Sequence, residues 1–125
     1  MPNEFLRGEI WWVSLDPTVG SEIRKRRPCV VISSDVFGHL PMRVVVPFTS
    51  WQLRFSNQPN RMRVAASALN GLTSDSGADA LQIRSVDVAR FASRLGVLAK
   101  EDLDEISARI AQVVEFNAEG ERPRT

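Results

Sequence analysis

Hydrophobic residues occur along most of the chain in short runs, and this pattern predicts β-strands. Residues 8–15 combine tryptophan with β-branched side chains, whereas residues 28–33 form a continuous apolar run that is typical of a strand buried on both faces. Turn-forming pairs such as Asn70-Gly71 separate the runs. By the same criteria we expect further strands over 43–48, 61–65, 79–86 and 94–98.

Helical patterns occur in two places. Ser34 is a suitable N-cap for a short helical turn that Gly38 ends. Over 100–116 apolar residues recur every three or four positions, which predicts an amphipathic helix that packs on the sheet as a lid. Together these elements predict a mainly β (α+β) fold: a small, strongly bent antiparallel barrel or half-barrel with a C-terminal helix. The apolar stripe of the helix consists of Leu103, Ile106, Ile110, Val113 and Val114.

Pro47 lies near the end of the third expected strand. Proline has no N–H group to donate to a neighbouring strand, so we expect it to break the ladder at this point. The break would turn Thr49 and Ser50 away from regular pairing and leave their hydroxyl groups free.

Residues 51–60 have the composition of a long, mobile loop. The loop contains Trp51 and Phe55 beside Arg54. Aromatic side chains next to an arginine are suited to stacking on single-stranded bases, and a loop folded over the core would use the same residues. Both interpretations are open at this stage, and we include Trp51 and Arg54 among the candidate RNA-binding residues.

Four consecutive cations, Arg24, Lys25, Arg26 and Arg27, lie in the loop before the second strand. Like charges this close repel each other, and a phosphate backbone is the commonest ligand that would neutralise them. A solvated loop that keeps the chain soluble is the alternative for such a run alone. Basic residues also gather in the first half of the chain, where 1–63 carries nine Arg or Lys and five acids, against seven and ten in 64–125.

The length and composition indicate one globular domain. We expect the 125 residues to divide into a domain over 1–116 and a disordered polar tail over 117–125. No apolar run approaches the ~20 residues of a membrane span, and the N-terminus has no signal-peptide pattern, so we expect a cytoplasmic protein without a membrane partner. Cys29 and His39 are the only residues of their kinds. They predict neither a disulfide nor a zinc site, and Cys29 is expected to be a small core side chain.

Trp11 and Trp12 are neighbours on the first expected strand. Successive strand side chains point to opposite faces, so the two rings cannot both enter one core. One of them is expected either within the domain on its second face, or in a subunit interface or beside bound bases.

Five segments in this order and spacing resemble the MazF/PemK family of bacterial toxins, and with the terminal helix the resemblance covers nearly the whole chain to Phe116. Each motif is weak alone, but five in register are specific. The segments are Arg7-Gly8-Glu9-Ile10-Trp11, Pro17-Thr18-Val19-Gly20-Ser21-Glu22, Arg27-Pro28-Cys29-Val30-Val31-Ile32, Val46-Pro47-Phe48-Thr49-Ser50 and Gln82-Ile83-Arg84-Ser85-Val86-Asp87.

The resemblance implies an SH3-like barrel, a homodimer, and a ribonuclease that cuts single-stranded RNA at short sequences without a metal or other cofactor. It also implies neutralisation by a cognate antitoxin, and an acidic, disordered peptide would suit the basic loop. Arg27 and Thr49 match the family's catalytic arginine and threonine, and Ser50 is expected to assist them. Glu22 is our candidate for the general base, with a loop-holding ion pair as the alternative.

The remaining RNA-binding candidates are Arg24, Lys25 and Arg26 in the loop and Gln82 and Arg84 in the last motif. The chain departs from the family at Leu81, where many members have a polar or acidic residue, and any acid or base role at that position is therefore in doubt. Two other functions stay open. A related toxin fold poisons DNA gyrase without hydrolysis, and a non-catalytic barrel would bind RNA without cutting it.

Overall fold

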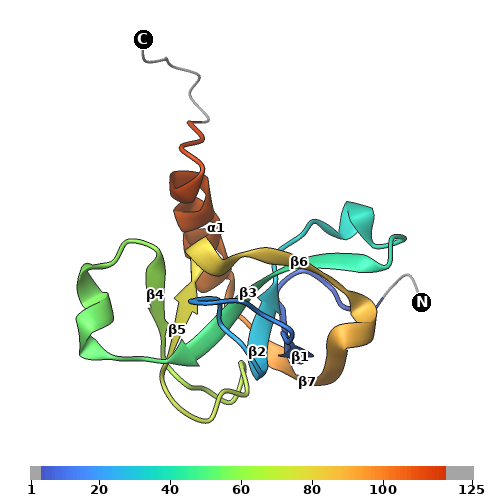
Figure 1. Ribbon diagram of the computed structural model, residues 1–125, viewed down its shortest axis with the longest axis horizontal. Helices are drawn as coiled ribbons and strands as arrows, with labels where there is room; N and C mark the ends of the chain where they lie inside the picture. The colour runs from blue at the N-terminus through green and yellow to red at the C-terminus, as the bar shows by residue number, and fades with distance from the viewer. Residues whose placement is uncertain (1–3, 118–125) are drawn as a thin grey trace.

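The computed structural model describes residues 4–117 and contains seven strands and one α-helix. Figure 1 shows β4 and β5 on one side of the molecule and β1 and β7 on the other. The strands are β1 (Glu9–Ser14), β2 (Arg26–Val31), β3 (Met42–Ser50), β4 (Arg61–Val64), β5 (Ser76–Asp79), β6 (Arg84–Asp87) and β7 (Phe91–Val97). The helix is α1 (Lys100–Val113), and the 3₁₀ turns are η1 (Asp35–Phe37), η2 (Leu53–Asn57), η3 (Ala80–Gln82) and η4 (Val88–Arg90).

The strands form one antiparallel sheet in the order β4-β5-β3-β2-β1-β7, and β6 pairs with β3 outside this sequence. The mainly β fold with a C-terminal helix is therefore confirmed. The sheet is not a closed barrel, because no ladder within residues 4–117 joins β4 to β7. The long strand β3 is its centre, since β2, β5 and β6 all pair with it.

The expected break at Pro47 does not occur. β3 continues to Ser50, and Thr49 and Ser50 pair with Gly77 and Ser76. Proline is tolerated here because one edge of β3 changes partner at this point: its pairing with β6 ends at Val45, and its pairing with β5 begins at Phe48. Pro47 lies in the interval between them, where a missing N–H breaks no ladder hydrogen bond on that edge.

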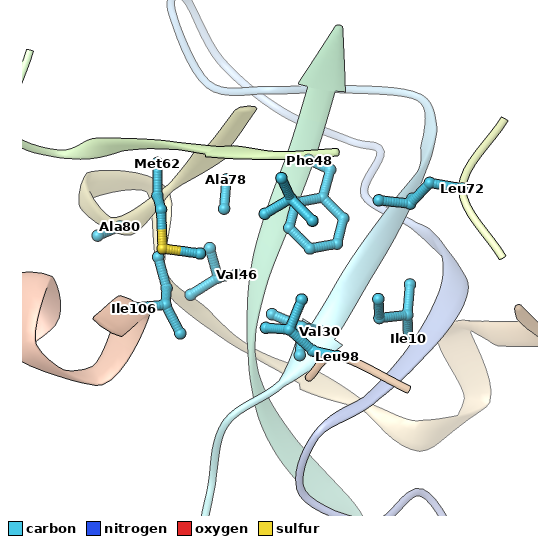
Figure 2. Packing of buried hydrophobic residues seen from close by; sticks show 11 residues of the cluster. Ile10, Val30, Val46, Phe48, Met62, Leu72, Ala78, Ala80, Leu98 and Ile106 are labelled. Atoms are coloured by element: carbon cyan, nitrogen blue, oxygen red, sulfur yellow. The ribbon is translucent and has the colours of Figure 1, made fainter. Parts of the chain in front are cut away.

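Two apolar clusters cover the two faces of the central strands. Neighbouring residues of β2 enter different clusters, as Val30 and Val31 do, which confirms that this strand is buried on both faces. The larger cluster lies between the sheet and α1 and is drawn in Figure 2; its buried members are Ile10, Val30, Val46, Phe48, Met62, Val64, Leu72, Ala78, Ala80, Leu98 and Ile106. The smaller cluster consists of Val13, Leu15, Cys29, Val31, Val45 and Val86.

The helix α1 begins at Lys100 as expected and packs through the predicted stripe, with Ile106 fully buried. Val114 is the exception, because the helix ends at Val113 and the Val114 side chain is 66% exposed. Leu103, Ile110 and Val113 are partly buried against the same cluster, and this packing is consistent with the lid role. Of the tail over 117–125, for which we predicted disorder, residues 118–125 lie outside the described part of the chain.

Two other predictions need correction. Residues 79–86 are not one strand: β5 ends at Asp79, and η3 separates it from β6. The cause is local, because the Asp79 carboxylate accepts a hydrogen bond from the Leu81 N–H and turns the chain. The long loop expected over 51–60 is interrupted by η2, which places Phe55 in the interior with 3% of its surface exposed, as in the alternative of a loop folded over the core.

Candidate active site

A cleft of about 220 Å³ lies where the ends of β2 and β3 meet the β4–β5 connection. Its lining combines cationic and hydroxyl-bearing residues with apolar ones, so it offers contacts for a charged group and for an apolar one. The lining residues are Trp12, Arg26, Arg27, Pro28, Phe48, Thr49, Ser50, Leu72, Thr73, Ser74, Ser76 and Leu95.

Arg27 is half-buried at the start of β2, and its backbone is fixed by pairing with Val13 of β1. Its Nε donates a hydrogen bond to the Arg24 carbonyl at 3.1 Å. The two Nη groups make no hydrogen bond within residues 4–117 and no ion pair there. One edge of the guanidinium is therefore held by the protein, and its other donors are available for an anion.

Thr49 lies opposite on β3. Its Oγ1 atom is buried and has no hydrogen-bond partner among the described residues. The hydroxyl group is thus free as expected, although the reason is not the one predicted: the backbone is regularly paired and only the side chain lacks a partner. Such a group is costly to bury, which indicates a ligand that completes its hydrogen bonding.

The cationic residues Arg24, Lys25 and Arg26 are all exposed, and none of them forms an ion pair within residues 4–117. Lys25 has a φ of 71°, a backbone conformation that residues other than glycine rarely adopt. Its N–H donates to the Asp16 carboxylate at 3.1 Å. The loop therefore holds a concentrated positive charge in one specified shape beside the cleft, which Arg26 lines.

Glu22 is placed in the same loop but does not line the cleft. Its carboxylate accepts a hydrogen bond from the Val19 N–H at 2.8 Å, which closes the turn between them. The predicted alternative, an ion pair, is not present within the described residues; the carboxylate holds the loop through a backbone hydrogen bond instead. A role as general base stays a prediction.

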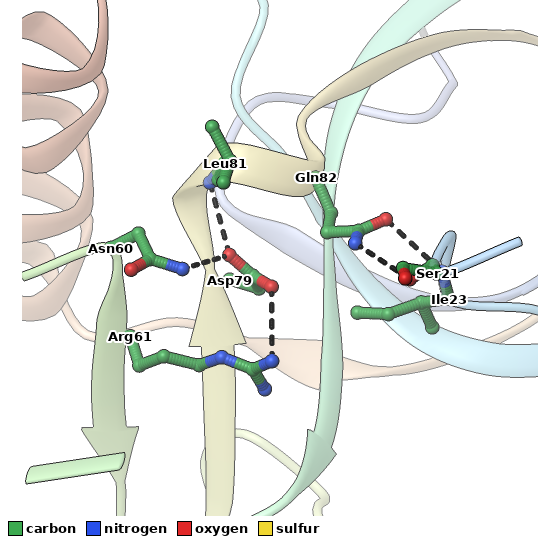
Figure 3. Close-up of polar contacts among 7 residues, drawn as sticks. All are labelled: Ser21, Ile23, Asn60, Arg61, Asp79, Leu81 and Gln82. Carbon is green, nitrogen blue, oxygen red and sulfur yellow. Dashed lines mark hydrogen bonds and ion pairs between the residues drawn. The ribbon is translucent and has the colours of Figure 1, made fainter. Parts of the chain in front are cut away.

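Gln82 and Arg84 are brought next to the cationic loop by η3 and β6. The Gln82 carboxamide bonds the backbone of Ser21 and of Ile23, as Figure 3 shows, and an Arg84 Nη group donates to the Leu15 carbonyl at 3.0 Å. The structure thus shows both side chains bonding the protein's own backbone. RNA contact by either stays a prediction.

Trp51 and Arg54 lie on the η2 side rather than in the cleft. The Trp51 ring packs edge-on against Phe55 and lies over Gly77, where an added Cβ would approach the ring to 3.2 Å. Arg54 donates to Gln52 and lies 5.0 Å from the centre of the Phe55 ring. Both side chains are partly accessible, and their contact with RNA stays a prediction.

The two tryptophans do face different ways. Trp11 packs against Phe5 and Phe91, whereas Trp12 lines the cleft. The apolar residues Leu72 and Leu95 were not predicted as site residues. Turn chemistry was the only signal near Leu72, and its place in the cleft depends on the pairing of β5 with β3, which the local sequence does not reveal.

Cys29 is fully buried in the smaller cluster, as expected for a core side chain. Burial raises the pKa of its thiol far above the ordinary value, and the positive charge of Arg84 offsets this only in part. The thiol therefore stays protonated and is a poor nucleophile. No group of three or more His, Cys, Asp or Glu side chains suited to a metal ion occurs within residues 4–117, and no helix there has the length and apolar character needed to cross a membrane.

Comparison with known proteins gives concordant results. The profile of a family described as PemK-like, MazF-like toxins of type II toxin-antitoxin systems matches residues 6–114. The Mycobacterium tuberculosis protein named endoribonuclease MazF9 is 36% identical over 106 residues, covering 80% of this chain and 87% of that protein.

Solved structures share the fold. MazF from Deinococcus radiodurans has a TM-score of 0.74 at 23% identity, covering 88% of this chain and 96% of that one. An endoribonuclease of a mycobacterial species, solved with its cognate antitoxin, has a TM-score of 0.71 at 18% identity, covering 90% and 96%. Sheet and helix therefore follow an arrangement already seen in other chains.

Proposed function

Because this chain belongs to the family of PemK-like, MazF-like toxins of type II toxin-antitoxin systems, we propose that it is an endoribonuclease that cuts single-stranded RNA in the Arg27–Thr49 cleft. The similar M. tuberculosis protein bears the name of an endoribonuclease. One observation carries the choice of site: the buried, unpartnered Thr49 hydroxyl lines the same cleft as an arginine with free donors. An RNA phosphate would satisfy both groups.

The proposed reaction needs no metal ion. The 2′-oxygen next to the scissile phosphate forms a new bond to phosphorus, and the bond from phosphorus to the 5′-oxygen of the next nucleotide breaks. The products are a 2′,3′-cyclic phosphate and a free 5′-hydroxyl, and the proton lost by the 2′-hydroxyl balances the one gained by the 5′-oxygen. Negative charge grows on the non-bridging oxygens during this step.

Arg27 and Thr49 are suited to stabilise that charge. The free Nη groups of Arg27 can donate to two phosphate oxygens, and the Thr49 hydroxyl can donate to one. Ser50 is at the exposed end of β3 and lines the cleft beside them. Arginine is an unsuitable proton donor because its pKa is so high in all proteins, so its role is electrostatic.

Glu22 is proposed as the base that removes the 2′-hydroxyl proton. Its exposed carboxylate already accepts one hydrogen bond and has acceptor capacity left. Substitution Glu22→Gln keeps the shape and the Val19 contact but removes the basicity. It should slow cleavage without weakening RNA binding, and equal cleavage rates would remove Glu22 from the mechanism.

The cations of the loop are proposed to hold the RNA backbone on either side of the cut. Arg24, Lys25 and Arg26 carry no protein counter-ion within the described residues. Sequence selectivity would come from the part of the cleft that can contact a base, where Trp12 and the half-buried Leu95 supply apolar surface.

The function is tested by incubating the purified protein with a long, unstructured RNA in excess EDTA and mapping the ends by primer extension. We expect discrete cuts, absent in Arg27→Ala and Thr49→Ala and retained in Arg94→Ala, an exposed arginine outside the cleft. Intact RNA with the wild-type protein would contradict the proposal. RNA that shifts on a gel but is never shortened would favour a binding protein, and gyrase inhibition without RNA cleavage would favour the non-hydrolytic toxin.

Two protein partners belong to the same proposal. The first is a cognate antitoxin with an acidic, disordered segment, supported by the mycobacterial relative solved with its antitoxin and by the unpaired cations of the loop. If the product of a neighbouring gene with such a segment neither bound nor inhibited the protein, this part would fail.

The second partner is another copy of the chain. We propose that each chain has an SH3-like fold and that two of them form a homodimer, which acts in the cytoplasm. The exposed Leu81 and the half-buried Val113 line a pocket of about 220 Å³ beside α1 and would supply apolar contact area. Sedimentation equilibrium measures the mass directly, and a monomer at micromolar concentration would contradict the dimer.

A further inference from the structure

Gln82 connects two parts of the chain that are about sixty residues apart. Its Nε2 donates to the Ser21 carbonyl at 3.1 Å, and its Oε1 accepts from the Ile23 N–H at 3.0 Å. Figure 3 shows both bonds converging on the loop from one carboxamide. A side-chain amide that bonds a carbonyl and an N–H in this way substitutes for a neighbouring strand and fixes the backbone between them.

The turn η3, which carries Gln82, is itself held by several contacts of Asp79. Asp79, with 2% of its surface exposed, accepts from the Leu81 N–H at 3.1 Å and from the Asn60 amide at 2.7 Å. The same carboxylate lies 3.5 Å from the Arg61 guanidinium. These contacts, also drawn in Figure 3, fix η3 between β5 and β6 and thereby fix the direction of the Gln82 side chain.

The loop has few other constraints. Among the hydrogen bonds of the described residues, only those of Gln82 connect 18–24 to a distant part of the chain. The adjacent cations repel one another. Lys25, which follows the segment in a left-handed conformation, is held separately: its N–H donates to the Asp16 carboxylate at 3.1 Å, and its carbonyl accepts from the Leu15 N–H at 2.8 Å. Without the two bonds from Gln82, the part of the segment before Arg24 would have many accessible conformations, and the Arg24–Lys25 peptide would be held from one side only, by Asp16.

The end of this segment determines how Arg27 is held. The Arg24 carbonyl, next to Ile23 in sequence, accepts from Arg27 Nε and sets which edge of the guanidinium faces the cleft. We propose that Gln82 is a positioning residue, which fixes the loop from Ser21 to Arg24 and through it the orientation of the Arg27 guanidinium. This inference rests on the proposed function, because it gives a role in cleavage to a residue outside the cleft lining.

The rival role for Gln82 is direct contact with an RNA base. The two roles differ in the RNA-free protein. A positioning residue protects the Ile23 N–H from exchange before any RNA arrives, whereas a base-reading residue changes only which sequences are cut. Gln82→Met keeps the side-chain length and removes both bonds, and Gln82→Glu keeps the acceptor for Ile23 and loses the donor to Ser21.

The test is amide hydrogen exchange at Ile23 in the RNA-free protein, with Val30 in the core of β2 as the internal reference. We expect Ile23 to exchange about 10-fold faster in Gln82→Met and by a smaller factor in Gln82→Glu, with Val30 unchanged, because two ordinary hydrogen bonds together contribute about this much to local closure. Gln112→Met, the same change on the exposed side of α1, should leave Ile23 unchanged.

Cleavage is the second readout. We expect kcat to fall about 10-fold in Gln82→Met at the same cut sites, because transition-state stabilisation by a misoriented arginine is reduced. Unchanged Ile23 exchange, equal acceleration at Val30, or altered cut sites with an unchanged rate would each overturn the proposal. If the wild-type protein cut no RNA, the proposed function would fail, while the exchange measurement would still decide whether Gln82 holds the loop.

Discussion

Arg43 and Arg27 lie on adjacent strands of one sheet, yet their guanidinium groups have opposite surroundings. Arg43 is 5% exposed and donates to five backbone carbonyls, those of Glu4, Phe5, Gly38, Leu40 and Met42. Arg27 is half-buried and donates to one carbonyl, that of Arg24. The first arginine has no donor left for a ligand, whereas the second has two Nη groups free.

The comparison separates a structural arginine from a functional one by the use of donors rather than by burial. Arg43 connects the N-terminal segment to the loop before β3, and its bonds are internal to the folded chain. Arg27 has its orientation fixed by the protein and its charge unneutralised beside the cleft. An unsatisfied, oriented donor is the feature expected of a site that binds an anion.

The largest expected effects come from making the same substitution at both arginines. Arg27→Met should lower the single-turnover cleavage rate about 10³-fold and leave the free energy of unfolding nearly unchanged, since donors to developing charge contribute about this much. Arg43→Met should lower that free energy by about 3 kcal/mol, because five hydrogen bonds between a buried guanidinium and backbone carbonyls are lost. Urea denaturation measures the free energy of unfolding, and single-turnover RNA cleavage measures the rate. A destabilised Arg27→Met that still cleaves RNA, beside a stable Arg43→Met that does not, would contradict the distinction.

Thr49→Val should produce effects of opposite sign on stability and activity. Valine has nearly the shape of threonine and removes a buried hydroxyl that lacks a partner, so unfolding should cost about 1 kcal/mol more. Cleavage should slow about 100-fold because one donor to the phosphate is lost. Ser14→Val, at an exposed position of β1, controls for the strand propensity of valine. A destabilised Thr49→Val would show that the hydroxyl has a bonding partner in solution.

The smallest expected effect concerns the exposed cations. Replacing Arg24, Lys25 and Arg26 by glutamine should flatten the plot of log affinity for single-stranded RNA against log salt by about 2, since each phosphate contact contributes about 0.7. Unlike Arg27, these residues should affect binding more than the cleavage step. An unchanged slope and affinity would show that the loop does not touch the RNA backbone.

Much of the fold could be predicted from the sequence, because hydrophobic periodicity reports burial directly. The two-sided burial of β2, the position of α1 and the η1 turn all follow from local pattern. The predicted break of the ladder at Pro47 was wrong, because the effect of a proline depends on which strand lies beside it. The division of 79–86 was missed because an aspartate cap inside an apolar run looks like any polar residue of a strand.

The site was predictable only where the family motifs carried it. Arg27 and Thr49 do line one cleft, but the sequence pattern does not show that Arg43 uses every donor internally whereas Arg27 keeps two groups free, since donor use depends on where the fold places the carbonyls. For the same reason Gln82 could be assigned to RNA contact but not to the Ser21 and Ile23 backbone. Residues about sixty positions apart come together only through the order in which the strands pair, and a local sequence pattern does not specify that order.

The most direct measurement is the NMR response of arginine side chains to RNA. The protein is labelled with ¹⁵N at arginine and titrated with an oligonucleotide that carries a 2′-deoxy nucleotide at the mapped cut, which prevents cleavage. We expect the Arg27 guanidinium resonances to shift and its Nη rotation to slow, while those of Arg43 stay unchanged. A response at Arg43 with none at Arg27 would contradict the assignment of the cleft as the site of RNA cleavage.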